Sequence, residues 1–219
     1  MPGKPITEQG LEKDLSYILQ GTAAHQVFAV ACPPKAGIKV LEPGCGSGKF
    51  GLSYAAAGAE VVLMDIDDGV LDYARALQRK LEAYLGRNLC VTILQGNLHR
   101  LVVRFGRNRF DYVLNEGLAH HWSDWRRQSC LNQMVAVTKP GGVVCTMCSN
   151  ALCPVMLDYA NRIEHTYEGM PPHQQPLHPE ELAARLARAG LDSKSIFVAP
   201  VGTDSWEDSM LIAGWGRKP

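Results

Sequence analysis

The sequence predicts an α/β fold, in which helices cover both faces of a mostly parallel sheet. From residue 37 onward, apolar runs of strand length alternate with longer segments whose apolar residues recur at helical spacing. The first of these runs also passes directly into a glycine-rich turn that opens a helix. Parallel strands need a long crossover between them, and a helix usually supplies it, so this alternation is typical of a parallel sheet.

Each element follows from apolar spacing and from the residues that start or stop helices. An amphipathic helix is predicted over 7–20, with Thr7 as its N-cap, and a second apolar stretch follows over 22–32. The helix over 124–137 stops at the Lys-Pro-Gly-Gly turn at 139–142, because proline and glycine end it and turn the chain. The predicted strands are 38–41, 60–64, 90–94, 110–114, 142–147, 195–198 and 209–215, and the other predicted helices are one that ends at Tyr54, 68–85, and 179–189.

The composition is that of a soluble globular protein, and it argues against two classes of partner. Of the 219 residues, 46% are hydrophobic and 20% are charged. Basic and acidic residues balance at 22 each, so no overall charge favours nucleic acid or an anionic membrane surface. We therefore expect neither as a partner, and the sequence does not predict an oligomeric state.

The cysteines indicate a reducing compartment and no metal site. Seven cysteines are scattered through apolar segments, which is typical of buried thiols rather than of a disulfide framework. Cys145 and Cys148 should point to opposite sides of a strand, and no second pair completes a tetrahedral ligand set. The N-terminus MPGKPITEQG lacks the apolar core of a signal peptide, so we expect a cytoplasmic protein.

The main chemical signal is the turn after the first strand, LEPGCGSGKFG at 41–51. It is not a phosphate-binding P-loop, because Phe50 follows Gly48-Lys49 where a hydroxyl is needed and Pro43 occupies the first glycine position. A dinucleotide pattern GxGxxG can be fitted to the glycines, but Glu42 would then place a carboxylate close to a pyrophosphate. A cofactor with cationic groups and no phosphate suits an acidic residue at this strand end.

With an acidic residue, one further residue and then GxGxG, this turn resembles motif I of class I S-adenosylmethionine-dependent methyltransferases. The similarity extends over about residues 36–149 and includes three further motifs. Strand two ends in an Asp-Ile-Asp sequence at 65–67, which is similar to the family's acidic position that binds the ribose hydroxyls. Strand three runs into Gln95-Gly96-Asn97-Leu98, which resembles the motif that contacts adenine, although the family more often has Asp at position 97. The turn at 139–142 is similar to the one before strand five.

The resemblance implies that S-adenosylmethionine is the cofactor, and it assigns a set of residues to that cofactor. These residues are Glu42, Gly44, Cys45, Gly46, Ser47, Asp65, Ile66, Asp67, Gly96, Asn97, Leu98, Asn115 and Glu116. An alternative role for Asp65 is a simple N-cap of the following helix.

The resemblance also implies a Rossmann-like fold with a seven-stranded sheet and an antiparallel last strand. We expect a single domain over 1–219. Within it we expect a helical flank at 1–36, a cofactor-binding core at 37–149, an insert on the substrate side at 151–177 and a C-terminal part of the sheet at 178–219. The insert is predicted to form a helix plus a loop, and its candidate acceptor contacts are Tyr159, His165, Tyr167 and His173.

The loop after strand four should face the cofactor's methyl group, because ligands bind beyond the carboxyl ends of the strands in open α/β sheets. This loop, Asn-Glu-Gly-Leu-Ala-His-His-Trp at 115–122, lacks the Asn-Pro-Pro-Tyr type sequence of relatives that methylate amino groups of DNA or protein amides. His121 and His120 are the candidate bases that would take a proton from the acceptor. The alternative is that they cap or pack against the next helix.

The predicted function is therefore methyl transfer from S-adenosylmethionine to an acceptor that we expect to be a small molecule. Two other functions stay open from the sequence. One is an NAD-dependent oxidoreductase, and the other is a non-catalytic domain that keeps the fold as a binding module.

Overall fold

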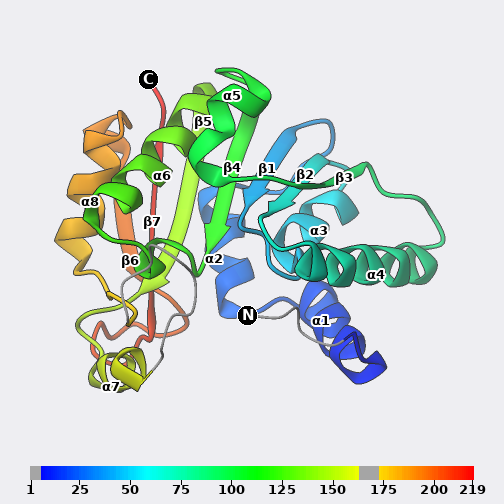
Figure 1. Cartoon of the computed structure of the whole chain (residues 1–219), viewed down its shortest axis with the longest axis horizontal. Helices are drawn as coiled ribbons and strands as arrows, with labels where there is room; N and C mark the ends of the chain where they lie inside the picture. Colours follow the sequence, from blue (N-terminus) through cyan, green and yellow to red (C-terminus); the bar gives the residue numbers. More distant parts are fainter. Residues whose placement is uncertain (1–5, 163–172) are drawn as a thin grey trace.

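The computed structural model describes residues 6–162 and 173–219, and its centre is a seven-stranded sheet (Figure 1). The strand order is β3-β2-β1-β4-β5-β7-β6, and β7 is antiparallel to both of its neighbours. This arrangement confirms the predicted Rossmann-like sheet with an antiparallel last strand. The strands are β1 (Lys39–Pro43), β2 (Glu60–Asp65), β3 (Val91–Gln95), β4 (Phe110–Glu116), β5 (Thr138–Ser149), β6 (Phe197–Pro200) and β7 (Leu211–Arg217).

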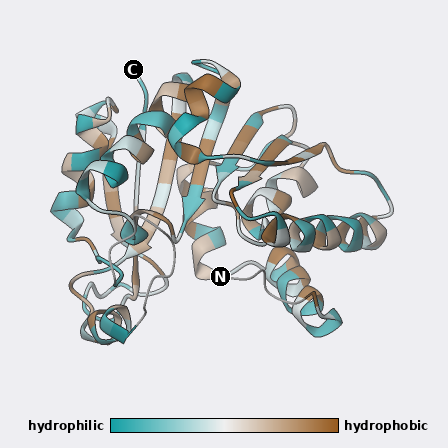
Figure 2. Ribbon diagram, in the orientation of Figure 1, coloured by the Kyte–Doolittle hydropathy of each residue, from teal (hydrophilic) through white to brown (hydrophobic). Residues whose placement is uncertain are grey.

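Helices cover both faces of the sheet, and Figure 2 shows hydrophobic residues (brown) concentrated on the strands between them. Two clusters of buried apolar side chains lie on the two faces, and successive residues of a strand alternate between them, as Val40 and Leu41 do in β1. The first cluster packs under α1–α4, and the second packs under α5, α6 and α8. The helices are α1 (Glu8–Gln20), α2 (Ala23–Ala31), α3 (Lys49–Ala56), α4 (Asp68–Leu85), α5 (Leu101–Phe105), α6 (Asp124–Val137), α7 (Pro154–Arg162) and α8 (Pro179–Arg188).

Local signals place several helix ends where the sequence predicts them. The Thr7 hydroxyl accepts a hydrogen bond from the N–H of Gly10 and caps α1. Helix α4 ends at Gly86, whose left-handed conformation (φ 65°) glycine adopts without strain. Helix α6 has the predicted bounds, and α7 forms within the segment predicted as a helix plus a loop.

The fifth strand begins earlier than predicted. It starts at Thr138 rather than at Gly142, and it includes the Lys-Pro-Gly-Gly sequence, which pairs irregularly with β4. A Cβ on Gly142 would lie 2.7 Å from the carbonyl oxygen of Asp111, so the close approach of the two backbones requires glycine here. The sequence interpretation also missed α5, because five residues span little more than one helical turn, which is too short for an apolar period to show.

Gly51 allows α3 to pack directly on the strands that carry the glycine-rich turn. A Cβ at this position would lie 2.4 Å from a methyl carbon of Leu63 and 2.8 Å from a carboxyl oxygen of Glu42. Both neighbours are buried, so a side chain here would push the helix away from the sheet.

Replacement of Gly51 by alanine should therefore lower the free energy of unfolding by about 1–3 kcal/mol, because the added methyl group overpacks the core. Urea denaturation measures this change. The control is Ser53→Ala on the same helix, where the hydroxyl donates to the carbonyl of Phe50. Equal urea midpoints for Gly51→Ala and the wild type would show that α3 can shift without cost.

Candidate functional site

The glycine-rich turn after β1 is bound to the end of β2 by backbone hydrogen bonds. The N–H groups of Gly44 and Cys45 both donate to the carbonyl of Met64, at 2.7 and 3.0 Å. Gly44, Gly46 and Gly48 all have positive φ angles, of 69°, 54° and 74°, which glycine adopts readily. A Cβ on Gly46 would meet no atom within 4 Å, so open space lies in front of this residue. Ser47 is half-buried in the same turn.

The Asp65 carboxylate joins the glycine-rich turn to the loop after β2. One oxygen accepts a hydrogen bond from the N–H of Gly46 at 3.1 Å, and the other accepts from the N–H of Asp67 at 3.1 Å. The cap of α4 is Asp67, whose side chain accepts from Gly69 and Val70. The helix cap that the sequence interpretation considered for Asp65 is therefore supplied by Asp67, which was expected among the cofactor ligands.

The Glu42 carboxyl lies behind the turn, with only 2% of the residue exposed. One of its oxygens accepts a hydrogen bond of 2.7 Å from the N–H of Gly51 in α3. Burial raises the pKa of Glu42 to about 8, although that hydrogen bond and the nearby Lys49 act in the opposite direction, and the negative charges of Glu116 and Asp65 raise it further.

The loops after β2 and β3 form the side of the site where the sequence predicts adenine. Ile66 is 60% exposed, whereas Leu98 is only 7% exposed. The side-chain Oδ1 of Asn97 accepts from the N–H of His99 and so caps the short helical turn Leu98–Arg100. The Gln95 amide donates to the carbonyl of Ile66 at 3.0 Å, which holds the two loops together. An open cavity of about 360 Å³ adjoins them, lined by Met64, Gln95, Gly96, Asn97, Arg100, Val103 and Arg104.

The end of β4 contacts the glycine-rich turn directly. The buried Asn115 amide donates to the carbonyl of Pro43 at 2.7 Å, and the half-buried Glu116 ends the strand. A Cβ on Gly44 would lie 3.0 Å from the Leu118 side chain, so this glycine packs against the loop that follows β4. The structure thus brings the turns after β1, β2 and β4 to one edge of the sheet, as the sequence predicts.

The two candidate bases lie in a short 3-10 turn, Ala119–His121, and they have different surroundings. His120 is buried, and its Nδ1 accepts a hydrogen bond of 3.0 Å from the N–H of Ser149 at the end of β5. Its neutral ring therefore carries the proton on Nε2. His121 is half-buried, and the centres of the two rings are 4.2 Å apart.

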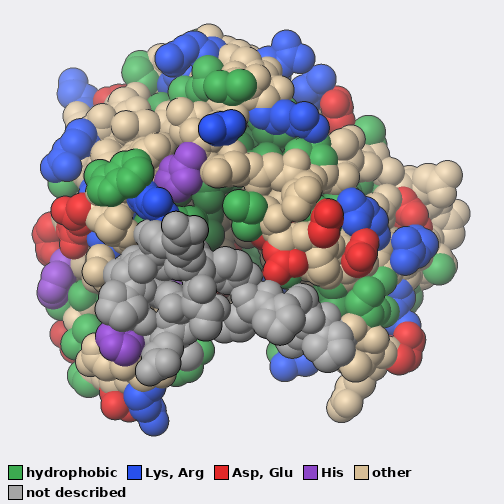
Figure 3. Space-filling model, in the orientation of Figure 1, with side chains coloured by type: hydrophobic (Ala, Val, Ile, Leu, Met, Phe, Trp, Pro, Cys, Tyr) green, Lys and Arg blue, Asp and Glu red, His purple; other side chains and the backbone are tan. Residues whose placement is uncertain are grey.

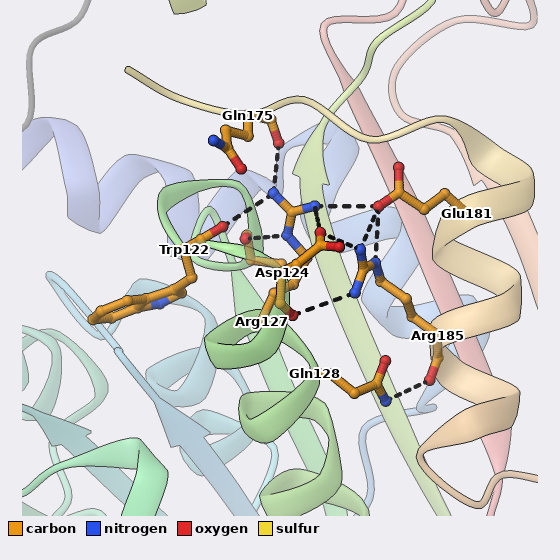
Figure 4. A network of polar contacts seen from close by, with 8 residues as sticks. Trp122, Asp124, Arg127, Gln128, Gln175, Glu181 and Arg185 are labelled. Carbon is orange, nitrogen blue, oxygen red and sulfur yellow. Dashed lines mark hydrogen bonds and ion pairs between the residues drawn. The ribbon is translucent and has the colours of Figure 1, made fainter. Parts of the chain in front are cut away.

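Arg127 of α6 contacts this histidine turn, and the sequence interpretation did not identify it. The guanidinium is buried and donates to the carbonyls of Ala119 and Trp122, which lie on either side of the two histidines (Figure 4). A signal was present in the sequence. Arg127 falls at helical spacing with Cys130, Leu131 and Met134, so a charged residue occupies the apolar stripe of the helix.

Part of the predicted acceptor-side insert can be placed. Tyr159 lies on α7 and is 43% exposed, and His173, where the described chain resumes, is half-buried. His165 and Tyr167 lie outside the described residues. Helix α7 contributes Met156 and Ala160 to a small apolar cluster of its own, together with Cys153.

The cysteines are free thiols with very different exposure. Cys32, Cys45, Cys130, Cys145, Cys148 and Cys153 are buried, whereas Cys90 is exposed. Burial raises the pKa of the Cys148 thiol to about 12. Cys145 and Cys148 belong to the apolar clusters on opposite faces of the sheet. Across 6–162 and 173–219, no three His, Cys, Asp or Glu side chains gather closely enough to hold a metal ion, and no helix could cross a membrane.

Acidic side chains surround the glycine-rich turn. Figure 3 shows Asp and Glu side chains (red) on the exposed face near the start of α4. Burial and the charges of Glu116 and Asp65 raise the pKa of Glu42, so Glu42 is mostly neutral near pH 7 and the negative charge of the site lies on the other two carboxylates. This surplus of negative charge favours a cationic ligand over a pyrophosphate.

Comparison with known proteins identifies the family of the domain that carries this edge. Residues 40–142 match a family model described as a methyltransferase domain. The chain is 28% identical over 187 residues to the ubiquinone biosynthesis O-methyltransferase of Dinoroseobacter shibae, with 81% of this chain and 70% of that protein aligned. It is 29% identical over 126 residues to the malonyl-[acyl-carrier protein] O-methyltransferase of Pectobacterium atrosepticum, which covers 58% of this chain. The alignment spans only 44% of that second relative.

Solved structures share the fold at low sequence identity. The magnesium protoporphyrin IX methyltransferase of Synechocystis, with bound SAH, aligns with a TM-score of 0.66 and 17% identity, over 99% of this chain and 90% of that one. An S-adenosylmethionine-dependent methyltransferase from Mesorhizobium loti aligns with a TM-score of 0.67 and 17% identity, over 91% of this chain and 100% of that one. Together with the match over residues 40–142, the fold and the motifs at its carboxyl edge, these findings support a class I S-adenosylmethionine-dependent methyltransferase.

Proposed function

We propose that this chain transfers a methyl group from S-adenosylmethionine to an oxygen atom of a small-molecule acceptor. The observation that carries the proposal is the meeting of two features at one sheet edge. The glycine-rich turn leaves open space beside the Asp65 carboxylate, and Asn115 and Leu118 join this turn to the loop that leads to His120 and His121. The curated relatives named above are both O-methyltransferases, which favours oxygen as the acceptor atom.

The residues at this edge fit the cofactor of the family. Gly46 leaves room for the amino-acid portion, Asp65 offers a carboxylate to the ribose hydroxyls, and the exposed Ile66 offers an apolar surface to the adenine ring. When bound, S-adenosylmethionine supplies a methyl group activated on a sulfonium cation. The Asp65 and Glu116 carboxylates favour that charge, and they disfavour the pyrophosphate that an NAD-dependent oxidoreductase would have to bind.

His121 is the better candidate for the base that takes the acceptor's proton. The Nδ1 atom of His120 already accepts the Ser149 N–H, so a second proton on that ring would bring two N–H groups together. In its neutral form the His120 ring can donate from Nε2 but has no nitrogen left to accept. His121 is only half-buried, and a neutral histidine suits proton transfer near neutral pH.

The insert over 151–177 and the N-terminal helices are the proposed acceptor side of the site. Of the four candidate acceptor contacts, Tyr159 and His173 lie within the described residues. Seven unpaired cysteines are typical of a reducing compartment, which supports the expectation that the protein acts in the cytoplasm. The balanced charge supports a small molecule rather than a nucleic acid as the partner.

Ligand binding distinguishes this proposal from an oxidoreductase and from an empty scaffold. S-adenosylhomocysteine at 100 times its dissociation constant should stabilise the protein by about 2.7 kcal/mol, which raises the melting temperature by several degrees, whereas NAD should not. Asp65→Asn should weaken S-adenosylhomocysteine binding about tenfold, because an amide replaces the carboxylate offered to two hydroxyls. The control is Asp68→Asn, an exposed residue of the next helix. Stabilisation by NAD, or by neither ligand, would exclude the proposal.

Replacement of each histidine by asparagine separates their roles. His121→Asn should reduce the turnover number about 100-fold and leave the dissociation constant of S-adenosylhomocysteine nearly unchanged, because only the base is lost. His120→Asn should keep most of the activity, since the Asn oxygen can replace Nδ1 as the acceptor for Ser149. The assay follows labelled methyl groups into a low-molecular-weight metabolite extract. Full activity of His121→Asn would remove the base assignment.

The buried Glu42 should make the stability of the free protein depend on pH. Its pKa is raised from 4.5 to about 8 on folding, so in this range the folded state binds more protons than the unfolded chain. The free energy of unfolding therefore falls as the pH rises through this range, by about 3–5 kcal/mol in total for this group.

Glu42→Gln should remove this loss, because glutamine can accept the same hydrogen bond from Gly51 and does not ionise. Urea denaturation at about pH 5 and about pH 9 should show the variant gaining stability relative to the wild type as the pH rises. Glu60→Gln, at an exposed residue that pairs with Lys39, is the control and should show no such gain. A constant difference between Glu42→Gln and the wild type at both pH values would show that Glu42 is ionised throughout.

A further inference from the structure

Arg127 holds both ends of the turn that contains the two histidines. Its Nε donates to the carbonyl of Ala119 at 2.9 Å, and its Nη2 donates to the carbonyl of Trp122 at 3.1 Å. A planar guanidinium has five N–H donors in a fixed arrangement, so two carbonyls bound to it are fixed relative to each other. His120 and His121 are the residues between those carbonyls.

The same guanidinium also binds the chain that returns from the insert. Nη2 donates to the carbonyl of Gln175 at 3.0 Å, and the N–H of Gln175 donates in turn to the carbonyl of His120 at 2.8 Å. The returning chain is therefore bound to the histidine turn directly and through Arg127. It also pairs with the end of β5, where the N–H of Leu177 donates to the carbonyl of Ser149.

On its other side, the Arg127 guanidinium pairs with a carboxylate that it shares with a second buried arginine, Arg185 (Figure 4). Arg127 is 3% exposed, and its Nη1 lies 3.2 Å from a carboxylate oxygen of Glu181 in α8. Arg185 is 6% exposed and binds the same Glu181 oxygen at 2.7 Å and Asp124 at 2.6 Å. Within the described part of the chain, the Arg185 guanidinium donates to these two acidic residues and not to the histidine turn. Both arginines are thus buried and paired with the same carboxylates, but Arg127 also donates to the histidine turn.

We propose that Arg127 is a positioning residue that orients His121 for proton transfer and couples its orientation to the returning chain at 173–177. This inference rests on the proposed function of His121. A shift of the returning chain would move the carbonyl of Gln175, and Arg127 would transmit that shift to the carbonyls of Ala119 and Trp122. The base and one wall of the proposed acceptor side therefore adopt their working geometry together.

Lysine cannot replace Arg127 in this role, because a single ammonium nitrogen cannot reach three carbonyls and Glu181 in the same arrangement. Arg127→Lys should therefore lower the turnover number about 10- to 100-fold and leave the dissociation constant of S-adenosylhomocysteine nearly unchanged. Arg185→Lys is the matched control. It weakens the same carboxylate network and should change turnover by no more than about threefold.

Two further measurements separate positioning from general destabilisation. Hydrogen exchange should quicken in the peptides over 117–123 and 173–178 of Arg127→Lys, and it should remain slow there in Arg185→Lys. The pH dependence of turnover that His121 produces should also change in Arg127→Lys, whereas a lower fraction of folded protein would scale the whole profile equally. Arg127→Gln serves as a second variant and should show the same changes.

The exchange measurement decides the inference even if methyl transfer is never detected. Quicker exchange in the two peptides of Arg127→Lys, with none in Arg185→Lys, supports the coupling whatever the fate of the His121 assignment. Equal exchange in the two variants would overturn the inference, as would equal loss of turnover in both.

Discussion

The hydrogen bonds between the glycine-rich turn and the end of β2 are the constraint on which the site depends. Met64 accepts from Gly44 and Cys45, and Asp65 accepts from Gly46. These bonds fix the turn in a backbone conformation that requires glycine at three positions. Asp65 is the proposed partner of the ribose, and the turn at Gly46 is the proposed place of the amino-acid portion. Because Asp65 is bonded to Gly46, the distance between these two parts of the proposed cofactor site is fixed.

A second set of contacts joins this cofactor half to the half that would receive the acceptor. Asn115 bonds the carbonyl of Pro43, and Leu118 packs against Gly44, so the loop after β4 begins in contact with the turn after β1. The loop ends at His121, where Arg127 and the end of β5 hold it. The turn proposed to hold the methyl donor and the loop proposed to face the acceptor therefore follow adjacent strands, which makes their separation a property of the sheet rather than of flexible side chains.

Periodicity and local signals were enough to predict that seven strands form, the bounds of α4 and α6, and the edge of the sheet where the motifs meet, although β5 begins four residues earlier than predicted and β6 and β7 lie two residues further along the chain. They could not show which acidic residue caps a helix. Asp65 and Asp67 both follow β2, and only the fold bonds Asp65 to Gly46 and leaves Asp67 to cap α4. The burial of Glu42 and the contacts of Arg127 were also hidden, because both depend on residues that are distant in sequence or on backbone carbonyls that carry no sequence signal.

The uneven exposure of the cysteines offers a way to follow ligand binding to this protein. Only Cys90 is exposed among the seven thiols, and it immediately precedes β3, at the amino end of that strand and so across the sheet from the motif loops. A maleimide dye on the unmodified chain would attach at this one place. Energy transfer to it from a labelled adenosyl ligand could then report ligand arrival without any cysteine being introduced or removed.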